Sequence, residues 1–195
     1  MAEQIQYDDA THTYRDKFGV VPSVTQVIHN VLMTEEERRH YHGHEEAMLR
    51  GRHVHTACRL WSDGELDEDS LDPRLVPYVD GWKLFAQESA FVCCAWEQLV
   101  YSRRERYAGR YDVRGRIGER RTLADIKSGA TAPWTVGVQL AGYARAGGLG
   151  AIDRLCVHLP GNGKYRAIEC KQRTDERVFL AALTVHNARL QRGKT

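Results

Sequence analysis

Long hydrophobic runs are missing from this chain of 195 residues. No stretch approaches the roughly 20 consecutive apolar residues that a membrane-spanning helix needs, so we expect no membrane partner. The opening residues, MAEQIQYDD, are acidic and lack the basic-then-apolar order of a secretory signal, which predicts a cytoplasmic protein. A disordered chain is also excluded, because 42% of the residues are hydrophobic and only 28% are charged.

Cysteine is scarce and poorly spaced for metal binding. The five cysteines are Cys58, Cys93, Cys94, Cys156 and Cys170. No two of them form a CxxC pair, so neither a zinc ribbon nor an iron–sulfur cluster is indicated, and we expect reduced thiols. His40, His42 and His44 alternate, but they have no cysteine or fourth spaced ligand nearby. They therefore favour an exposed polar run over a zinc site.

Positive and negative charges are divided unevenly along the chain. Residues 1–97 carry 9 Lys and Arg against 18 Asp and Glu, whereas residues 98–195 carry 19 against 8. Residues 103–121 alone hold eight arginines. Because the planar guanidinium suits bidentate contact with phosphate, this asymmetry favours a polyanionic partner such as nucleic acid. An arginine-rich solvated surface would give the same count.

The length suits a single domain, residues 1–195, in which a hairpin and helical lead-in (1–90) precedes an α/β core (91–195). Alternation of polar and aromatic residues predicts a hairpin over 7–21.

Three helix signals follow in the lead-in. Ser23 predicts the N-cap of a helix, and Gln26 completes a capping box. Apolar residues at four- and three-residue steps predict a helix over 47–61. The Asp-Pro pair at 72–73 predicts the start of another helix, with the aspartate as its cap.

The core is predicted to alternate strands and helices. Strands are predicted over 93–101, 107–117, 122–127, 152–159 and 164–170, with a hairpin turn at 160–163. Helices are predicted over 133–146 and 175–190, the latter with Phe179, Leu183, His186 and Leu190 on one side. This order predicts an α/β fold with a central mixed sheet flanked by helices.

The segment with the most chemistry is Asp125-Ile126-Lys127. On a strand, Asp125 and Lys127 emerge on one face about 7 Å apart, while Ile126 points into apolar packing on the other. A carboxylate beside an ammonium at a strand end suits the binding of a cation and a reactive water. Taken alone, this pattern favours a solvated ion pair, because D-x-K also occurs by chance.

A second carboxylate, Asp112, lies on the preceding predicted strand, on the same parity as three arginines. If that strand pairs with the Asp125 strand, as the short connection at Gly118 favours, the two carboxylates come close together. They would repel each other unless a divalent cation lies between them. Ligation by oxygen alone favours Mg²⁺ or Mn²⁺ over zinc.

Three further patterns are weak when taken singly. Glu97 lies inside an apolar predicted strand, where a buried carboxylate needs a cationic partner, either an arginine or a metal. Gly51 and His55 are four residues apart and share a helical face, on which glycine allows a neighbouring element to approach closely. Gln139 and Tyr143 share a face of the helix that follows the D-x-K strand.

In chain order, these patterns are GxxxH on a helix, a glutamate in a strand, GxxD, D-x-K ending a strand and QxxxY on the next helix. This series resembles the PD-(D/E)XK nuclease superfamily, and specifically its branch of RecB-type domains and lambda-type phage exonucleases. His12-x-Tyr14, Gly19 and Pro22-Ser23-Val24-Thr25 also resemble the lead-in of phage members. The resemblance covers residues 12–143. It implies a restriction-endonuclease-like core and a Mg²⁺-dependent deoxyribonuclease of phage-type recombination, replication or repair, in the host cytoplasm if phage-encoded.

The resemblance also implies roles for the matching residues. Asp112 and Asp125 would bind Mg²⁺, for which Mn²⁺ substitutes, together with the backbone carbonyl of Ile126. Lys127 would position or activate the attacking water. His55 would act as a further catalytic group on the metal or phosphate side, and Glu97 as a catalytic acidic residue that supports the site. The implied DNA-binding residues are Arg52, Arg110, Arg114, Arg116, Gln139 and Tyr143.

The sequence departs from the family in two ways. The proline that precedes the first acidic residue in the family name is absent, since Asp112 follows Tyr111. The cysteine quartet of the iron–sulfur members is missing as well, so no cluster is expected.

An exonuclease is the favoured interpretation, and two others stay open. One is a nucleic-acid-binding adaptor that has this fold but cleaves nothing. The other is an endonuclease with the same chemistry and a different substrate geometry. A single-strand annealing protein and a homo-oligomer are partners that the resemblance alone implies.

Overall fold

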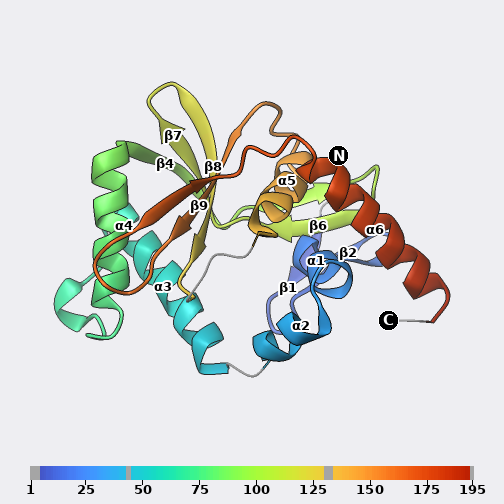
Figure 1. Cartoon of the computed structure of the whole chain (residues 1–195), viewed down its shortest axis with the longest axis horizontal. Coiled ribbons are helices and arrows are strands. Elements are labelled where there is room, and N and C mark those ends of the chain that lie inside the picture. The colour runs from blue at the N-terminus through green and yellow to red at the C-terminus, as the bar shows by residue number, and fades with distance from the viewer. Residues whose placement is uncertain (1–4, 43–44, 130–133, 194–195) are drawn as a thin grey trace.

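The computed structural model describes residues 5–42, 45–129 and 134–193 (Figure 1). The strands are β1 (Gln6–Asp8), β2 (Thr13–Asp16), β3 (Gly19–Val21), β4 (Phe91–Trp96), β5 (Leu99–Ser102), β6 (Tyr107–Arg110), β7 (Val113–Ile117), β8 (Arg120–Lys127), β9 (Asp153–His158) and β10 (Arg166–Glu169). The helices are α1 (Val24–Val31), α2 (Glu35–His42), α3 (Glu45–Asp63), the short 3₁₀ helix η1 (Glu68–Ser70), α4 (Val76–Ser89), α5 (Val136–Ala146) and α6 (Asp175–Gln191).

The centre of the fold is a mixed five-stranded sheet in the order β10-β9-β8-β7-β4. Strands β8 and β9 are parallel, and the other neighbours are antiparallel. A three-stranded sheet, β1-β2-β3, and a two-stranded sheet, β5-β6, accompany it. The prediction of an α/β fold with a central mixed sheet flanked by helices is therefore confirmed.

Helices cover both faces of the five-stranded sheet (Figure 1). On one face, Ile126 and Val157 pack against Val54 of α3 and Trp82 of α4. On the other face, Leu123 belongs to the core that α1, α5 and α6 complete. None of the described helices is both long enough and apolar enough to cross a membrane.

Several local predictions are confirmed because they rest on short-range chemistry. Ser23 Oγ accepts the amide of Gln26 at 3.0 Å, and the Gln26 side chain accepts the amide of Ser23 at 2.9 Å, which completes the capping box. The 160–163 turn joins β9 and β10 as an antiparallel pair. The predicted 7–21 hairpin gains a third strand, because β1 pairs with β2.

Other predictions are wrong in their boundaries. Asp72 and Pro73 form a turn in which the Leu75 amide donates to the Asp72 carbonyl, and α4 starts only at Val76. Of the four residues predicted to share one side of α6, Phe179, Leu183 and His186 are buried, whereas Leu190 near the end of the helix is 48% exposed. The predicted helix start at Pro133 lies outside the described residues, as do the side chains of His40, His42 and His44.

The predicted strands 93–101 and 107–117 are each broken in the middle. Glu97 adopts a left-handed conformation with φ of 46° and is exposed, so the prediction of a buried glutamate inside a strand is wrong. Tyr111 and Asp112 interrupt the second strand at the same level. Both breaks border the site described next.

Candidate active site

Strands β4, β5, β6 and β7 form one long antiparallel ribbon that bends at Glu97 and Asp112. Trp96 faces Val113 on one side of the bend, and Leu99 faces Arg110 on the other, so the register continues unchanged. Two backbone hydrogen bonds cross the bend: Glu97 N to Asp112 O at 2.7 Å, and Tyr111 N to Gln98 O at 3.3 Å. Because only the β7 half also pairs with β8, the ribbon leaves the central sheet at Asp112.

The fork between the departing ribbon and β8 leaves the backbone of Ile126 without a strand partner on that side. The β7–β8 register pairs Val113 with Ala124, so its continuation would set Tyr111 opposite Ile126. Tyr111 instead bonds Gln98. Asp112 Oδ2 accepts the Ile126 amide at 2.8 Å, and His55 Nε2 lies 2.9 Å from the Ile126 carbonyl oxygen. Since a carbonyl only accepts, Nε2 carries the proton. Two polar side chains thus take the place of the missing strand.

Asp125 and Lys127 lie on the opposite side of β8 from the Ile126 side chain, as the alternation of a strand predicts. Asp125 is fully buried, and its Oδ2 forms an ion pair with Lys127 Nζ at 2.7 Å. Its other oxygen accepts a hydrogen bond from Gln139 Nε2 at 3.0 Å. Burial raises the pKa of Asp125 to about 6, and the Lys127 ammonium offsets this only in part. A carboxylate that is this costly to ionise without a cation is typical of a functional site.

Helix α5 supports this carboxylate through the QxxxY pair. Gln139 Nε2 lies 3.2 Å from the hydroxyl oxygen of Tyr143 as well as contacting Asp125. The Tyr143 ring packs directly over Gly109 of β6, where an added Cβ would stand 2.4 Å from the ring. Only 3% of Tyr143 is exposed, and burial raises its pKa well above the usual value. Tyr143 is thus a buried support for Gln139, and its expected contact with DNA has no support from this geometry and stays a prediction.

Helix α3 brings His55 to the site from the other face of the sheet. His55 Nδ1 lies 3.7 Å from Asp112 Oδ1, so the imidazole spans the Asp112 carboxylate and the Ile126 carbonyl. Gly51, one turn earlier, faces Ser128, and a Cβ placed there would meet Ser128 Oγ at an ordinary 3.6 Å. The expected close approach at Gly51 is therefore present but leaves room for a methyl group.

His158 is a site residue that the sequence patterns did not indicate. It is 3% exposed, sits opposite Lys127 in the β8–β9 register, and its Nε2 lies 2.7 Å from the carbonyl oxygen of Gly129. It therefore anchors the chain just after the D-x-K segment. The sequence signal that could have indicated it is its position at the end of the predicted strand 152–159. A single histidine in an apolar strand is usually part of the core, so this signal is weak.

The predicted DNA-binding arginines are distributed around the site. Arg114 and Arg116 lie on β7 and alternate with Val113, which packs toward α3 and α4, so they point to the sheet face of Asp125 and Lys127. Arg116 is exposed and pairs with Glu119 at 2.9 Å. Arg110, just before Asp112, lies over the Tyr7 ring with its guanidinium carbon 5.1 Å from the ring centroid, and Arg52 is exposed on α3.

Glu97 contributes its backbone, and not a buried carboxylate, to this arrangement. Its amide bonds the Asp112 carbonyl and holds the bend, while its side chain is exposed. The expected catalytic role of Glu97 has no support from this geometry and stays a prediction.

The candidate metal ligands at the fork suit a hard cation. Asp112, Asp125 and the Ile126 carbonyl offer oxygen only, which Mg²⁺ and Mn²⁺ prefer. Asp125 Oδ2 is buried, and the ammonium of Lys127, 2.7 Å away, is the positive charge that faces it. Within residues 5–42, 45–129 and 134–193, no three His, Cys, Asp or Glu side chains are gathered as a ready metal cage. Two carboxylates and a carbonyl are the set that a metal would use here.

Neither protein-family models nor curated proteins yield a match to this chain.

Proposed function

We propose that this chain is a Mg²⁺-dependent deoxyribonuclease of the PD-(D/E)XK type, with a restriction-endonuclease-like core. The observation that supports this most is the meeting of Asp112, Asp125 and Lys127 at one end of β8, where β7 leaves the sheet. A solvated ion pair would be exposed, whereas Asp125 is fully buried and held by Gln139. Burying an ionisable group costs free energy, and groups buried in this way are concentrated at functional sites.

The residues at the fork would have separate roles in the reaction. Asp112, Asp125 and the Ile126 carbonyl would hold the metal, and Gln139 keeps the Asp125 carboxylate oriented. Lys127 carries a positive charge at the same carboxylate, where it can orient a water molecule or stabilise charge that develops on the phosphate. A bound Mg²⁺ would supply Lewis acidity toward the phosphoryl oxygen and acidify a bound water.

The basic residues near the site suit the backbone of DNA. Arg114 and Arg116 share the sheet face of Lys127, and guanidinium groups bind phosphate without reading the base sequence. We therefore propose binding that weakens with salt and depends little on sequence. An exonuclease is the favoured activity, and we propose a place in DNA recombination, replication or repair.

The decisive experiment follows cleavage of linear duplex DNA, labelled at the 5′ or 3′ end, with Mg²⁺ or with a chelator. Lys127→Ala should reduce cleavage by about 10²–10³-fold, as for the loss of one group that stabilises the transition state. The matched control is Lys83→Ala, which removes a lysine from an ion pair with Glu68 at 2.7 Å on α4. The control should cleave like the parent.

Three outcomes separate the candidates. Equal activity of the Lys127 and Lys83 variants would contradict the role of Lys127. Cleavage of covalently closed circular DNA would identify an endonuclease. DNA binding without any cleavage, and without heat on titration with Mg²⁺ or Mn²⁺, would identify the non-catalytic adaptor.

A further inference from the structure

An aromatic side chain projects into solvent at the tip of the β2–β3 hairpin, away from the candidate active site. Phe18 is 70% exposed. Two cations flank its ring: Lys17 Nζ lies 4.8 Å and the Arg106 guanidinium carbon 5.2 Å from the ring centroid. Single exposed apolar residues are common, but this exposed ring is held beside two positive charges by cation–π attraction.

The tip that carries Phe18 is held rigidly by Asp16. The Asp16 carboxylate accepts the Phe18 amide at 2.8 Å, the Tyr101 hydroxyl at 2.8 Å, and two bonds from Arg106 at 2.9 and 3.0 Å. Its side chain is only 4% exposed, and the hydrogen bonds from Arg106 lower its pKa to about 2. This single carboxylate therefore fastens the β2–β3 tip to the turn between β5 and β6.

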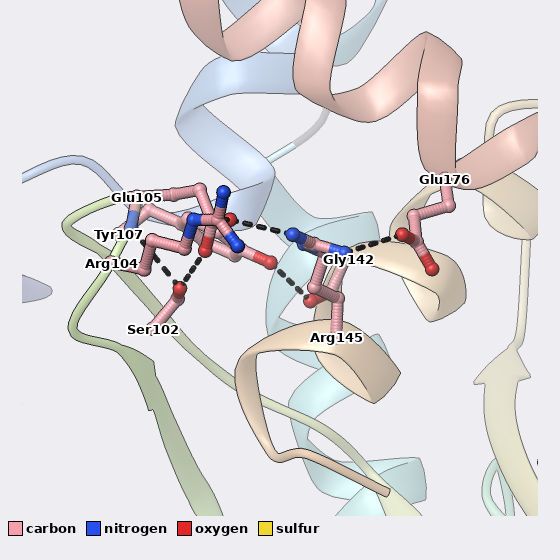
Figure 2. Close-up of polar contacts among 7 residues, drawn as sticks. All are labelled: Ser102, Arg104, Glu105, Tyr107, Gly142, Arg145 and Glu176. Atoms are coloured by element: carbon pink, nitrogen blue, oxygen red, sulfur yellow. Dashed lines mark hydrogen bonds and ion pairs between the residues drawn. The ribbon is translucent and has the colours of Figure 1, made fainter. Parts of the chain in front are cut away.

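A second set of contacts fastens that turn to the helical layer (Figure 2). Glu105 accepts hydrogen bonds from the Ser102 hydroxyl and from Arg145 of α5, the latter at 2.6 Å. Figure 2 shows Arg145 between Glu105 and Glu176 of α6, to which it donates at 2.6 Å. The Tyr107 hydroxyl donates to the Gly142 carbonyl at 2.9 Å. Both tips are thus anchored to the core of the protein.

The two segments that Asp16 joins, residues 16–18 and 103–106, are basic. They hold four cations, Lys17, Arg103, Arg104 and Arg106, against two carboxylates, Asp16 and Glu105, which leaves a net charge of +2. Arg103 and Arg104 are exposed in the turn. An exposed ring that is fixed in place offers a stacking surface at little cost in conformational entropy, and the cations beside it suit phosphate.

We propose that Phe18 and the cations around it form a stacking site for an unpaired base of a nucleic-acid strand. A base has a π-face for the ring and carries a phosphate for the guanidinium groups, whereas a protein partner would be expected to use a broader apolar patch. This proposal rests on the proposed function in one respect only, namely that the bound polymer is a nucleic acid.

The position of this site relative to the candidate active site is set by β6. Six residues, mostly extended, lead from Arg106 to Asp112, which corresponds to about 20 Å. A strand bound at Phe18 would therefore be held at a distance from the reacting phosphate. The stacking site would secure an unpaired part of the substrate while another part lies at the fork.

The test measures binding of a fluorescently labelled single-stranded 20-nucleotide DNA by anisotropy, in chelator, with Lys127→Ala as the background. Phe18→Ala should raise the Kd about tenfold, and Phe18→Trp should restore binding, because any aromatic face supports stacking. The matched control is Val20→Ala, since Val20 is 57% exposed on the adjacent β3. It should leave the Kd unchanged. The salt dependence of log Kd should be the same with and without Phe18, because the substitution removes no phosphate contact.

Equal Kd values for the Phe18→Ala and Val20→Ala proteins would overturn the stacking site, whatever the cleavage assays show. Weaker binding by Phe18→Ala would support it even if the parent protein never cleaves DNA, so failure of the nuclease proposal is distinguishable. If instead self-association depends on Phe18 while DNA binding does not, the surface is a protein contact and the proposal is wrong.

Discussion

Asp112 Oδ2 lies 2.8 Å from the amide nitrogen of Ile126 and serves as the hydrogen-bond acceptor that β7 no longer supplies. One carboxylate thus closes a gap in the sheet and faces the candidate metal position. Its structural and chemical roles can be separated by substitution.

Asp112→Asn keeps an oxygen that accepts the Ile126 amide, so its free energy of unfolding should stay near that of the parent. Asp112→Ala leaves a buried amide without a partner and should cost about 1–3 kcal/mol. Both variants should lose Mn²⁺ binding and DNA cleavage. Urea unfolding and calorimetric titration with Mn²⁺ measure the two effects. Retained Mn²⁺ binding in the Asn variant would contradict ligation by this carboxylate.

The ion pair between the buried Asp125 and the partly exposed Lys127 should be unfavourable for folding relative to a neutral pair of similar shape. Lys127→Met alone leaves a buried carboxylate and should lower the free energy of unfolding by about 1–3 kcal/mol. The double variant Asp125→Asn, Lys127→Met removes both charges, keeps an acceptor for Gln139, and should be at least as stable as the parent although inactive. A double variant less stable than Lys127→Met would contradict this, and a double-mutant cycle in urea measures it.

The raised pKa of Asp125 predicts a defined dependence on pH. The pKa of its carboxyl is about 6 in the folded protein and near the usual 3.8 in the unfolded chain. The folded state therefore binds the proton more tightly, and the resulting stability is fully present below about pH 4 and is lost as the pH rises through about 6. As the pH rises from about 4 to above 6, the parent should therefore lose free energy of unfolding relative to Asp125→Asn, which does not titrate at this position.

Metal binding should show the opposite trend over the same range. Because the proton and the cation compete for Asp125, Mn²⁺ affinity should fall as the pH is lowered from 7.5 to 5. Calorimetric titration at several pH values checks this. A constant Mn²⁺ affinity would mean that Asp125 is not a ligand.

Two glycines near the site should respond oppositely to alanine. In Gly109→Ala the new Cβ would stand 2.4 Å from the buried Tyr143 ring, so the variant should lose about 1–3 kcal/mol and displace the support of Gln139. Gly51 lies within α3, and in Gly51→Ala the new methyl group would stand at an ordinary van der Waals distance, 3.6 Å, from Ser128 Oγ. That variant should gain about 0.5–1 kcal/mol from helix propensity. Thermal unfolding of the pair measures the contrast, and a stable Gly109→Ala protein would mean that the ring can move.

The sequence predicted the features that depend on local periodicity. Asp125 and Lys127 lie opposite the Ile126 side chain because alternation in a strand is a property of the backbone, and Ser23 caps α1 because its partner Gln26 is three residues away. Gln139 and Tyr143 lie on one side of α5 because they are four residues apart.

The features that the sequence did not predict depend on distant parts of the chain. The left-handed Glu97 is not favoured by its residue type, and it follows from the bend of a ribbon whose partner strand lies about fifteen residues later. The burial of Tyr143 depends on Gly109 in another strand, where the missing side chain leaves room for the ring. His158 acquires its role only when β9 lines up beside β8.

The bulge at Cys94 in β4 has a consequence for how this protein can vary in length. The register between β4 and β7 shifts by one residue there, and the shifted register then runs through the bend into β5 and β6. Deleting Cys94 would keep both registers, because Cys93 opposite Gly115 and Ala95 opposite Arg114 would become consecutive pairs. It would remove the extra bend and twist that a bulge gives a strand. Extra residues inserted into the turn at 103–106 would also leave every pairing at the fork as it is. Both changes of length should therefore keep Glu97 opposite Asp112, and only the deletion should alter the curvature of the ribbon near the point where it leaves the sheet.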